Sequence, residues 1–152
     1  MLSQTTEYAL RLVVQLASQH GQPVTIPELA RSTKTPEGYL AKVLRQLSRA
    51  GLVRSQRGPH GGSVLARAPE EISVLDVVQA VDPLKRIEVC PLRLRTHGAN
   101  LCPLHRRLDQ AIASVETAFR ASSLADILGD PQGSRPLCGE PRGRRAPGGG
   151  GR

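Results

Sequence analysis

Three cysteines, Cys90, Cys102 and Cys138, are the residues whose type is best suited to chemistry. An odd number argues against a framework of paired disulfides, and in a reducing compartment thiols more often serve as metal ligands, redox sensors or inert side chains. Cys138 lies in a stretch of Gly, Pro and Arg where nothing fixes its geometry, so we assign it no role. Cys90 and Cys102 therefore remain as the candidate ligands or sensors.

A second group of residues is suited to contact with a polyanion. The segment 56–62, Gln-Arg-Gly-Pro-His-Gly-Gly, forms a glycine-rich turn with basic side chains. Glycine lets a turn approach a nucleic-acid backbone closely, and Arg is favoured in a narrow minor groove by its negative potential. The alternative is an ordinary tight hairpin, whose glycines serve only the backbone conformation. The predicted contacts in this turn are Arg57, His60, Gly61 and Gly62.

The helices that would position these groups can be located from apolar spacing and caps. Apolar residues recur at helical steps over residues 4–18, and a short helix is expected over 26–32, where Thr25 begins a capping box. A second cap followed by proline, at Thr35, opens a third helix that ends at Gly51. Two capped helices joined by a short connection predict a helix-turn-helix.

A β-hairpin is expected directly after the third helix. Residues 52–55 and 63–66 alternate like short strands on either side of the glycine-rich turn, which predicts a wing. A further helix, capped by Ser73 and ending near Val81, follows the hairpin. Together these elements predict a mainly α fold with a small β-hairpin wing, organised as a winged helix-turn-helix domain over residues 1–82.

The third helix is the expected recognition helix, because such a helix lies in the major groove and contacts base edges through its N-terminal residues. Basic residues along it are expected to reach phosphates, which position the protein without specifying sequence. The alternative is that these side chains form the solvated face of a surface helix. The predicted contacts are Lys34, Thr35, Glu37, Tyr39, Lys42, Arg45 and Arg49.

Residues 83–102 lack periodicity and are expected to form a loop that carries Cys90 and Cys102. A long amphipathic helix begins near Pro103 and, with a short C-terminal helix, completes a dimerisation region over 103–129. Its apolar stripe would be costly to expose on a monomer, which favours a homodimer. The predicted dimer contacts are Leu108, Ile112, Val115 and Phe119.

The net charge of +8 fits a polyanionic partner, either nucleic acid or an acidic membrane face, but the basic residues are spread along the chain. Residues 130–152 are rich in Gly, Pro and Arg and are expected to be a disordered basic tail. No run approaches the roughly 20 apolar residues that span a bilayer, and Glu7 and Arg11 interrupt the apolar start that a secretory signal would need. We expect a cytoplasmic protein that does not bind a membrane.

Three stretches of the chain resemble the Rrf-type winged-helix transcription regulators. They are residues 6–11, Thr-Glu-Tyr-Ala-Leu-Arg; residues 38–44, Gly-Tyr-Leu-Ala-Lys-Val-Leu; and residues 51–62, which end in the wing Arg-Gly-Pro-His-Gly-Gly. The resemblance covers about residues 1–128, and the combination of helix start and wing is quite specific. It implies a homodimer, with the long C-terminal helix of each chain crossing the other, bound to a palindromic operator in double-stranded DNA.

The resemblance also implies a sensor, because many members of the family hold an iron–sulfur cluster with three cysteines in the loop before the dimer helix. Cys90 matches the first cysteine and Cys102 the third, but the middle position holds no cysteine, and His97 lies beside it. Two thiolates with His97 and His105 could bind a [2Fe–2S] or [4Fe–4S] cluster or a zinc ion. Glu7 matches an acidic residue that, in some relatives, reaches the cluster from the other subunit. The alternative is that these side chains only pack or cap and that no cofactor binds.

We therefore expect a dimeric, sequence-specific DNA-binding repressor that senses redox state, nitric oxide or iron–sulfur status through a cluster in the cysteine loop. One alternative is a cofactor-free dimeric repressor controlled by a metabolite or a partner protein. Another is a non-sequence-specific nucleic-acid binder driven by the basic tail. An enzyme is not expected, because the sequence has no phosphate-binding glycine loop in a βαβ setting and no credible Ser–His–acid constellation.

Overall fold

Helices make up most of the described chain, and a β-hairpin accompanies them, as the sequence predicts. The structure is a computed structural model that describes residues 2–91 and 100–131. Within these two ranges, no helix has both the length and the apolar character needed to cross a bilayer. The elements in order are α1 (Gln4–Ser18), α2 (Ile26–Thr33), α3 (Glu37–Arg49), β1 (Val53–Gln56), β2 (Gly62–Leu65), η1 (Pro69–Glu71), α4 (Val74–Val81), α5 (Pro103–Arg120) and α6 (Leu124–Gly129).

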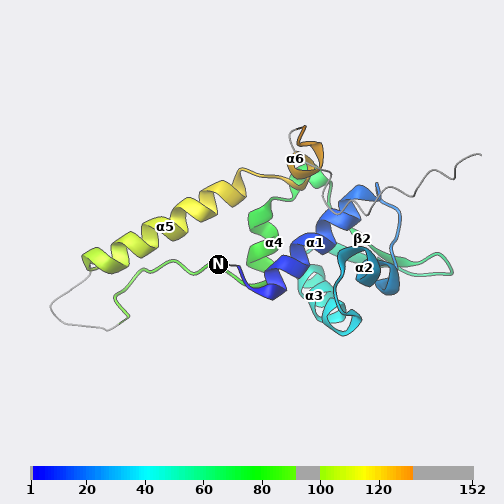
Figure 1. The fold of residues 1–152 in the computed structure, drawn as a ribbon, viewed down its shortest axis with the longest axis horizontal. Helices are drawn as coiled ribbons and strands as arrows, with labels where there is room; N and C mark the ends of the chain where they lie inside the picture. Colours follow the sequence, from blue (N-terminus) through cyan, green and yellow to red (C-terminus); the bar gives the residue numbers. More distant parts are fainter. Residues whose placement is uncertain (1, 92–99, 132–152) are drawn as a thin grey trace, which may run out of the picture.

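Helix α1 is the central element of the core (Figure 1). Its apolar residues recur every three or four positions, and this spacing buries Ala9, Leu12, Val13 and Leu16 along one stripe. Helices α2, α3, α4 and α6 all contact α1. Each fully buried Leu or Val contributes about 1.5–3 kcal/mol by removing apolar area from water. Packing against α1 therefore fixes the orientation of α3, the predicted recognition helix.

The connection between α2 and α3 is as short as the sequence indicated, three residues, but it lies slightly later in the chain. Helix α2 continues to Thr33, and Lys34 ends it in a left-handed conformation with a φ of 53°. The expected capping box at the other end of α2 is present, because the backbone amide and hydroxyl of Thr25 donate to the Glu28 carboxylate at 2.9 and 2.7 Å. The hydrogen bonds from the Thr25 side chain and backbone lower the pKa of Glu28.

Thr35 does not cap α3, and that prediction is wrong. The N-cap residue is Pro36, which has no side chain able to accept a bond. Thr35 is only 3% exposed; its backbone amide donates to the Ala30 carbonyl at 3.1 Å and its hydroxyl to the Thr33 carbonyl at 3.4 Å. Its polar groups are thus satisfied inside the turn. Thr35 closes the helix-turn-helix and does not face solvent.

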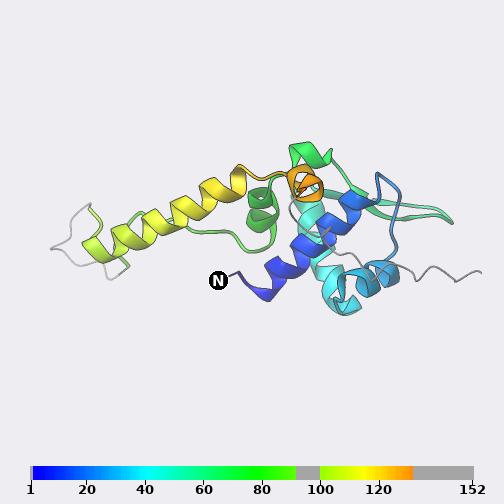
Figure 2. The ribbon, with the colours of Figure 1, turned by 45° about the horizontal axis from the view of Figure 1, so that its top comes forward.

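Strands β1 and β2 form an antiparallel hairpin in which Val53 lies opposite Leu65 and Gln56 opposite Gly62. Both strands lie within one residue of the predicted ranges. The hairpin projects from the helical body in both ribbon views (Figures 1 and 2). Its second strand is fixed to the α1–α2 connection, because the backbones of Val24 and Ser63 exchange hydrogen bonds of 3.0 and 2.8 Å. The wing is therefore attached to the helix-turn-helix by backbone bonds.

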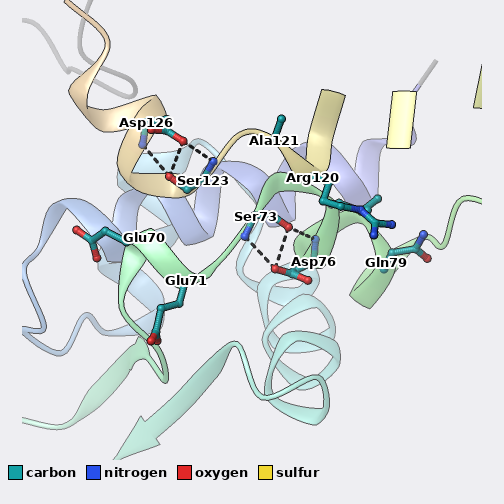
Figure 3. Close-up of a pocket in the computed structure, with 10 residues that line it drawn as sticks. Glu70, Glu71, Ser73, Asp76, Gln79, Arg120, Ala121, Ser123 and Asp126 are labelled. Atoms are coloured by element: carbon teal, nitrogen blue, oxygen red, sulfur yellow. Dashed lines mark hydrogen bonds between the residues drawn. The ribbon is translucent and has the colours of Figure 1, made fainter. Parts of the chain in front are cut away.

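The C-terminal part of the chain leaves the body after α4 and returns along α5, which extends as an arm (Figure 2). No residue of α5 is buried. Helix α6 then joins the body through Leu124, which is fully buried, and through a backbone bridge between Ser73 and Ser123. These two serines begin α4 and α6, and each bonds an aspartate in the first turn of its helix (Figure 3).

Candidate nucleic-acid interface and cysteine cluster

The outward face of α3 and the turn that precedes it carry the predicted contacts with DNA. All of these side chains except one are exposed. Thr35 is the exception, because it is 3% exposed and its side chain lies in the turn. The exposed predicted residues are Lys34, Glu37, Tyr39, Lys42, Arg45 and Arg49.

A groove of about 360 Å³ lies between α3 and the wing. Its charged lining residues are all arginines, Arg45 and Arg49 from α3 and Arg54 from β1, and hydroxyls such as Ser48 lie among them. Guanidinium groups are suited to bind phosphate oxygens through paired N–H donors. Arg54 was not among the predicted contacts, because alternation along a strand shows only that a side chain points outward. The hairpin pairing places it beside α3.

The glycines of the wing have two different roles. Gly58 alone in this turn has a positive φ, 113°, which side-chain-bearing residues rarely adopt. Gly62 is needed for packing, because an added Cβ would lie 2.6 Å from the carbonyl oxygen of Val24. At Gly61 an added Cβ would collide with the backbone of the facing strand. The requirements of a tight hairpin therefore account for these three glycines. The side chains of Arg57 and His60, in the same turn, are exposed.

Two tyrosines connect the second turn of α1 to the first turn of α3. The rings of Tyr8 and Tyr39 meet edge to face, with centroids 5.4 Å apart and planes at 73°. Gln4 donates a hydrogen bond of 2.8 Å to the hydroxyl of Tyr8, and the ammonium group of Lys42 lies 5.9 Å from the Tyr39 ring centroid. Helical spacing identified Tyr8 only as an apolar residue of the first helix and gave no signal for this contact.

Cys90 and Cys102 converge on one imidazole. The Sγ atoms of Cys102 and Cys90 lie 3.2 and 3.9 Å from Nδ1 of His105. Cys90 is 6% exposed, and Cys102 occupies the N-cap position of α5, three residues before His105. The structure therefore brings together three of the predicted ligands. His97 lies outside the described residues, and so do Cys138 and most of the predicted tail.

Glu7 does not join this cluster within the chain. Its carboxylate accepts a bond of 2.9 Å from Nε of Arg11 on the same helix, and Arg11 also donates to the carbonyl of Thr33 at 3.4 Å. Among residues 2–91 and 100–131, no group of three or more His, Cys, Asp or Glu side chains has an arrangement that could hold a metal ion. Two thiols and one imidazole are donors that suit iron–sulfur clusters or zinc, and the described residues add no fourth ligand to these three.

An ion-pair clamp holds the cysteine-bearing segment against α5. Nε and Nη2 of Arg86 donate to the two carboxylate oxygens of Asp109 at 2.7 and 2.6 Å, and the backbone amide of Ile87 adds a bond of 2.9 Å. Glu116 lies 3.6 Å from the same guanidinium. The bonds from Arg86 and Ile87 lower the pKa of Asp109 to about 2, and the bond to Asp109 raises the pKa of Arg86. The segment that carries Cys90 is thus fixed to the helix that carries His105.

The apolar stripe of α5 is largely open to solvent. Leu108 is 47% exposed and Val115 40%, while Ile112 and Phe119 are half-buried. Leu104, one turn before Leu108, is 64% exposed. Such a continuous exposed apolar face is unusual for a soluble monomer.

The family model described as Rrf2, iron-dependent transcriptional regulator, matches residues 2–130. The chain belongs to the Rrf2 family. Among curated proteins, the Rrf2 chain is 29% identical over 131 residues to a protein of Aquifex aeolicus (strain VF5) named as an HTH-type transcriptional regulator, which covers 84% of this chain and 91% of the relative.

Two solved structures place the fold of this Rrf2 protein among known regulators. The global cysteine regulator CymR of B. subtilis superposes with a TM-score of 0.70 at 28% identity, covering 84% of this chain and 95% of that one. IscR of T. potens superposes with a TM-score of 0.70 at 26% identity, covering 86% and 87%. The predicted family and the winged helix-turn-helix fold class are thus confirmed, and the chain is a DNA-binding transcriptional regulator.

A polar hollow of about 780 Å³ lies on this Rrf2 chain where η1, α4 and the α5–α6 connection meet (Figure 3). Its charged lining residues are four acids, Glu70, Glu71, Asp76 and Asp126, and one base, Arg120. An excess of carboxylates repels phosphate, so this hollow is unsuited to DNA. The groove between α3 and the wing has the opposite charge, because its charged lining residues are all arginines.

Proposed function

We propose that this Rrf2 protein binds a palindromic operator in double-stranded DNA as a homodimer and represses transcription from it. The observation that carries the proposal is the arginine groove between α3 and the wing, continuous with the exposed face of α3. The exposed residues at the start of α3 would contact base edges in the major groove. The groove arginines would hold phosphates, and Arg57 at the wing would approach the minor groove.

Dimerisation would come from α5. Its stripe of Leu108, Ile112, Val115 and Phe119 offers a second chain an apolar face that its own body leaves uncovered. Two copies related by a two-fold axis would present two recognition helices, and a palindromic operator has the same symmetry. Such a regulator acts where the DNA is, so we propose a cytoplasmic location.

The signal is proposed to act at Cys90, Cys102 and His105. Their donor atoms are of the types that bind an iron–sulfur cluster, which when bound would supply a redox- or nitric oxide-sensitive centre. His97 of this loop, or Glu7 of the second chain, would be the source of the missing ligand. Ligation would fix α5 relative to the DNA-binding body, and so set the distance between the recognition helices.

The second candidate is a cofactor-free dimeric repressor controlled by a metabolite or a partner protein. The observation in its favour is that both thiols already lie within contact of Nδ1 of His105, at 3.2 and 3.9 Å. In that case the cysteines would hold the loop on α5, and substituting them would leave the regulation intact.

The first test is anaerobic purification followed by visible absorption and by iron, sulfide and zinc analysis. Near-stoichiometric iron and sulfide, lost in Cys90→Ser and Cys102→Ser but kept in a His20→Gln control outside the cluster, supports the cluster. A colourless, metal-free dimer that binds its operator supports the cofactor-free repressor. Apo and holo proteins that bind one operator equally at fixed salt exclude the proposed switch.

A further inference from the structure

The contact between Tyr8 and Tyr39 lies at the part of the molecule that would read DNA. Tyr39 is the third residue of α3 and is 37% exposed. It therefore belongs to the N-terminal part of α3 that is proposed to contact the major groove. Tyr8 lies in the second turn of α1 and is half-buried. The two residues are 31 positions apart in sequence, and α1 itself is not part of the proposed DNA-contacting surface.

The ring of Tyr39 is held by two neighbours. The Tyr8 ring meets it edge to face at 5.4 Å, an arrangement favoured by the quadrupoles of both rings. The Lys42 ammonium group is 5.9 Å from its centroid, near the outer limit of a cation–π contact. The Tyr8 ring is in turn tethered by the bond from Gln4 to its hydroxyl.

The Tyr39 hydroxyl has no hydrogen-bond partner in the part of the chain that the structure describes. A phenol both donates and accepts a hydrogen bond, so it can address either kind of base-edge group. A ring that is already fixed loses less rotational freedom when DNA binds than a ring that turns freely. The Tyr39 side chain is therefore held in place before DNA binds, and the residue that holds it, Tyr8, belongs to α1.

We propose that Tyr8 is a positioning residue for sequence recognition: it fixes the ring of Tyr39 so that the Tyr39 hydroxyl meets the base edge in one orientation. This inference rests on the proposed role of α3 as the recognition helix. It assigns to α1 a part in operator specificity without any contact between Tyr8 and DNA.

The test begins with a DNA duplex selected by the wild-type protein from a randomised library, paired with a scrambled duplex of the same composition. Dissociation constants for both are measured at one salt concentration. Tyr8→Leu is expected to weaken binding to the selected duplex about threefold to tenfold, the range of an aromatic pair, and to leave the scrambled duplex unchanged. Tyr8→Phe keeps the ring and is expected to lose about twofold, and Gln4→Ala is expected to match it.

Tyr39→Leu should lose at least as much preference as Tyr8→Leu, and the double variant should be no worse than Tyr39→Leu alone. Gln15→Ala, a half-buried substitution elsewhere on α1, is the matched control and should leave both constants unchanged. Circular dichroism checks the fold of each variant. If Tyr8→Leu does not fold, the matched losses in Tyr8→Phe and Gln4→Ala carry the test, and wild-type affinity in both overturns the proposal.

An equal loss on both duplexes in Tyr8→Leu would show a general structural role and overturn the inference. Additive losses in the double variant would do the same, because Tyr8 would then act independently of Tyr39. If the wild-type protein selects no sequence, the proposed function itself fails. Wild-type selection with unchanged preference in Tyr8→Leu refutes only the role of Tyr8.

Discussion

The winged helix-turn-helix and the α5 arm are both built from amphipathic helices, yet only one of them completes its own core. In α1 the apolar stripe is fully covered by α2, α3, α4 and α6. In α5, a helix of 18 residues, no side chain is buried. The same 3.6-residue pattern therefore has two outcomes, and the difference lies in whether the chain supplies a partner surface. The DNA-binding part is structurally complete in one chain, while the arm has an open face.

Truncating the core of the first region should give the largest effect. Leu12 is fully buried at the centre of α1, so Leu12→Ala should lower the free energy of unfolding by about 2–5 kcal/mol through lost burial and a cavity. Chemical denaturation monitored by circular dichroism measures it. An equal loss in Leu104→Ala, whose side chain is 64% exposed, would contradict the contrast between the two regions.

A charge on the apolar face of the arm should act on assembly and spare the fold of the body. Val115→Asp is expected to weaken dimerisation by at least about 100-fold, because an interface would have to bury an unpaired carboxylate. Sedimentation velocity at several concentrations measures the shift from dimer to monomer. Gln110→Glu adds the same charge on the opposite side of α5 and should leave the dimer intact. Unchanged sedimentation in Val115→Asp would mean that this face is not the interface.

The wing should respond differently at two of its glycines. Gly62→Ala forces a Cβ to within 2.6 Å of the Val24 carbonyl oxygen and should cost about 1–3 kcal/mol of stability by overpacking. Gly58→Ala meets no neighbouring atom, so its cost comes only from the φ of 113°. Hydrogen exchange at the amides of Val24 and Ser63 distinguishes the two variants. Only Gly62→Ala should break the backbone bonds between these residues and so make their amides exchange faster. Protection of that bridge in both variants would argue against the packing role.

The smallest expected effect is the acid sensitivity of the Arg86–Asp109 clamp. The pKa of Asp109 is lowered to about 2 from 3.8, so the clamp contributes stability above pH 4 and loses it as the pH falls through the range from 4 to 2. Protection of the Ile87 amide, measured against the exchange rate of an unstructured peptide at the same pH, should therefore fall over this range. Asp109→Asn should show fast exchange at every pH, while Glu116→Gln, with its longer contact, should change it little. Protection of the Ile87 amide that does not change with pH in the wild-type protein would rule out the clamp.

Local patterns predicted the elements well because local physics determines them. The Thr25 capping box, the termination of α3 just before Gly51 and the wing all follow from residues close together in sequence. Thr35 could not be assigned in this way, because a threonine followed by proline reads as a cap whether its hydroxyl points outward or into the turn. Only the packing of α2 against α3 turns it inward.

Contacts between distant residues were not predictable from periodicity. Arg86 and Asp109 are separated by 23 positions and by a loop with no regular pattern, so nothing in the sequence pairs them. Helical spacing identified Tyr8 only as an apolar residue, and strand alternation identified Arg54 only as an outward-facing one. Neither pattern predicted that each of these residues lies beside α3. The convergence of Cys90, Cys102 and His105 was expected from the family resemblance, and the structure adds that one imidazole nitrogen faces both sulfurs.

The length of α5 also sets the distance between Cys102 and the DNA-binding body. With 18 residues at about 1.5 Å each, α5 is roughly 27 Å long, and Cys102 lies at the end that points away from the DNA-binding body (Figure 2). A one-degree tilt of a lever of that length moves its far end by about 0.5 Å. If the proposed sensing at Cys90 and Cys102 occurs, its effect would have to pass along the whole of α5 to the α3 of the same chain, or pass to the α3 of a second chain lying against it. Mixed dimers with Cys102→Ser in one chain would distinguish communication within a chain from communication between chains.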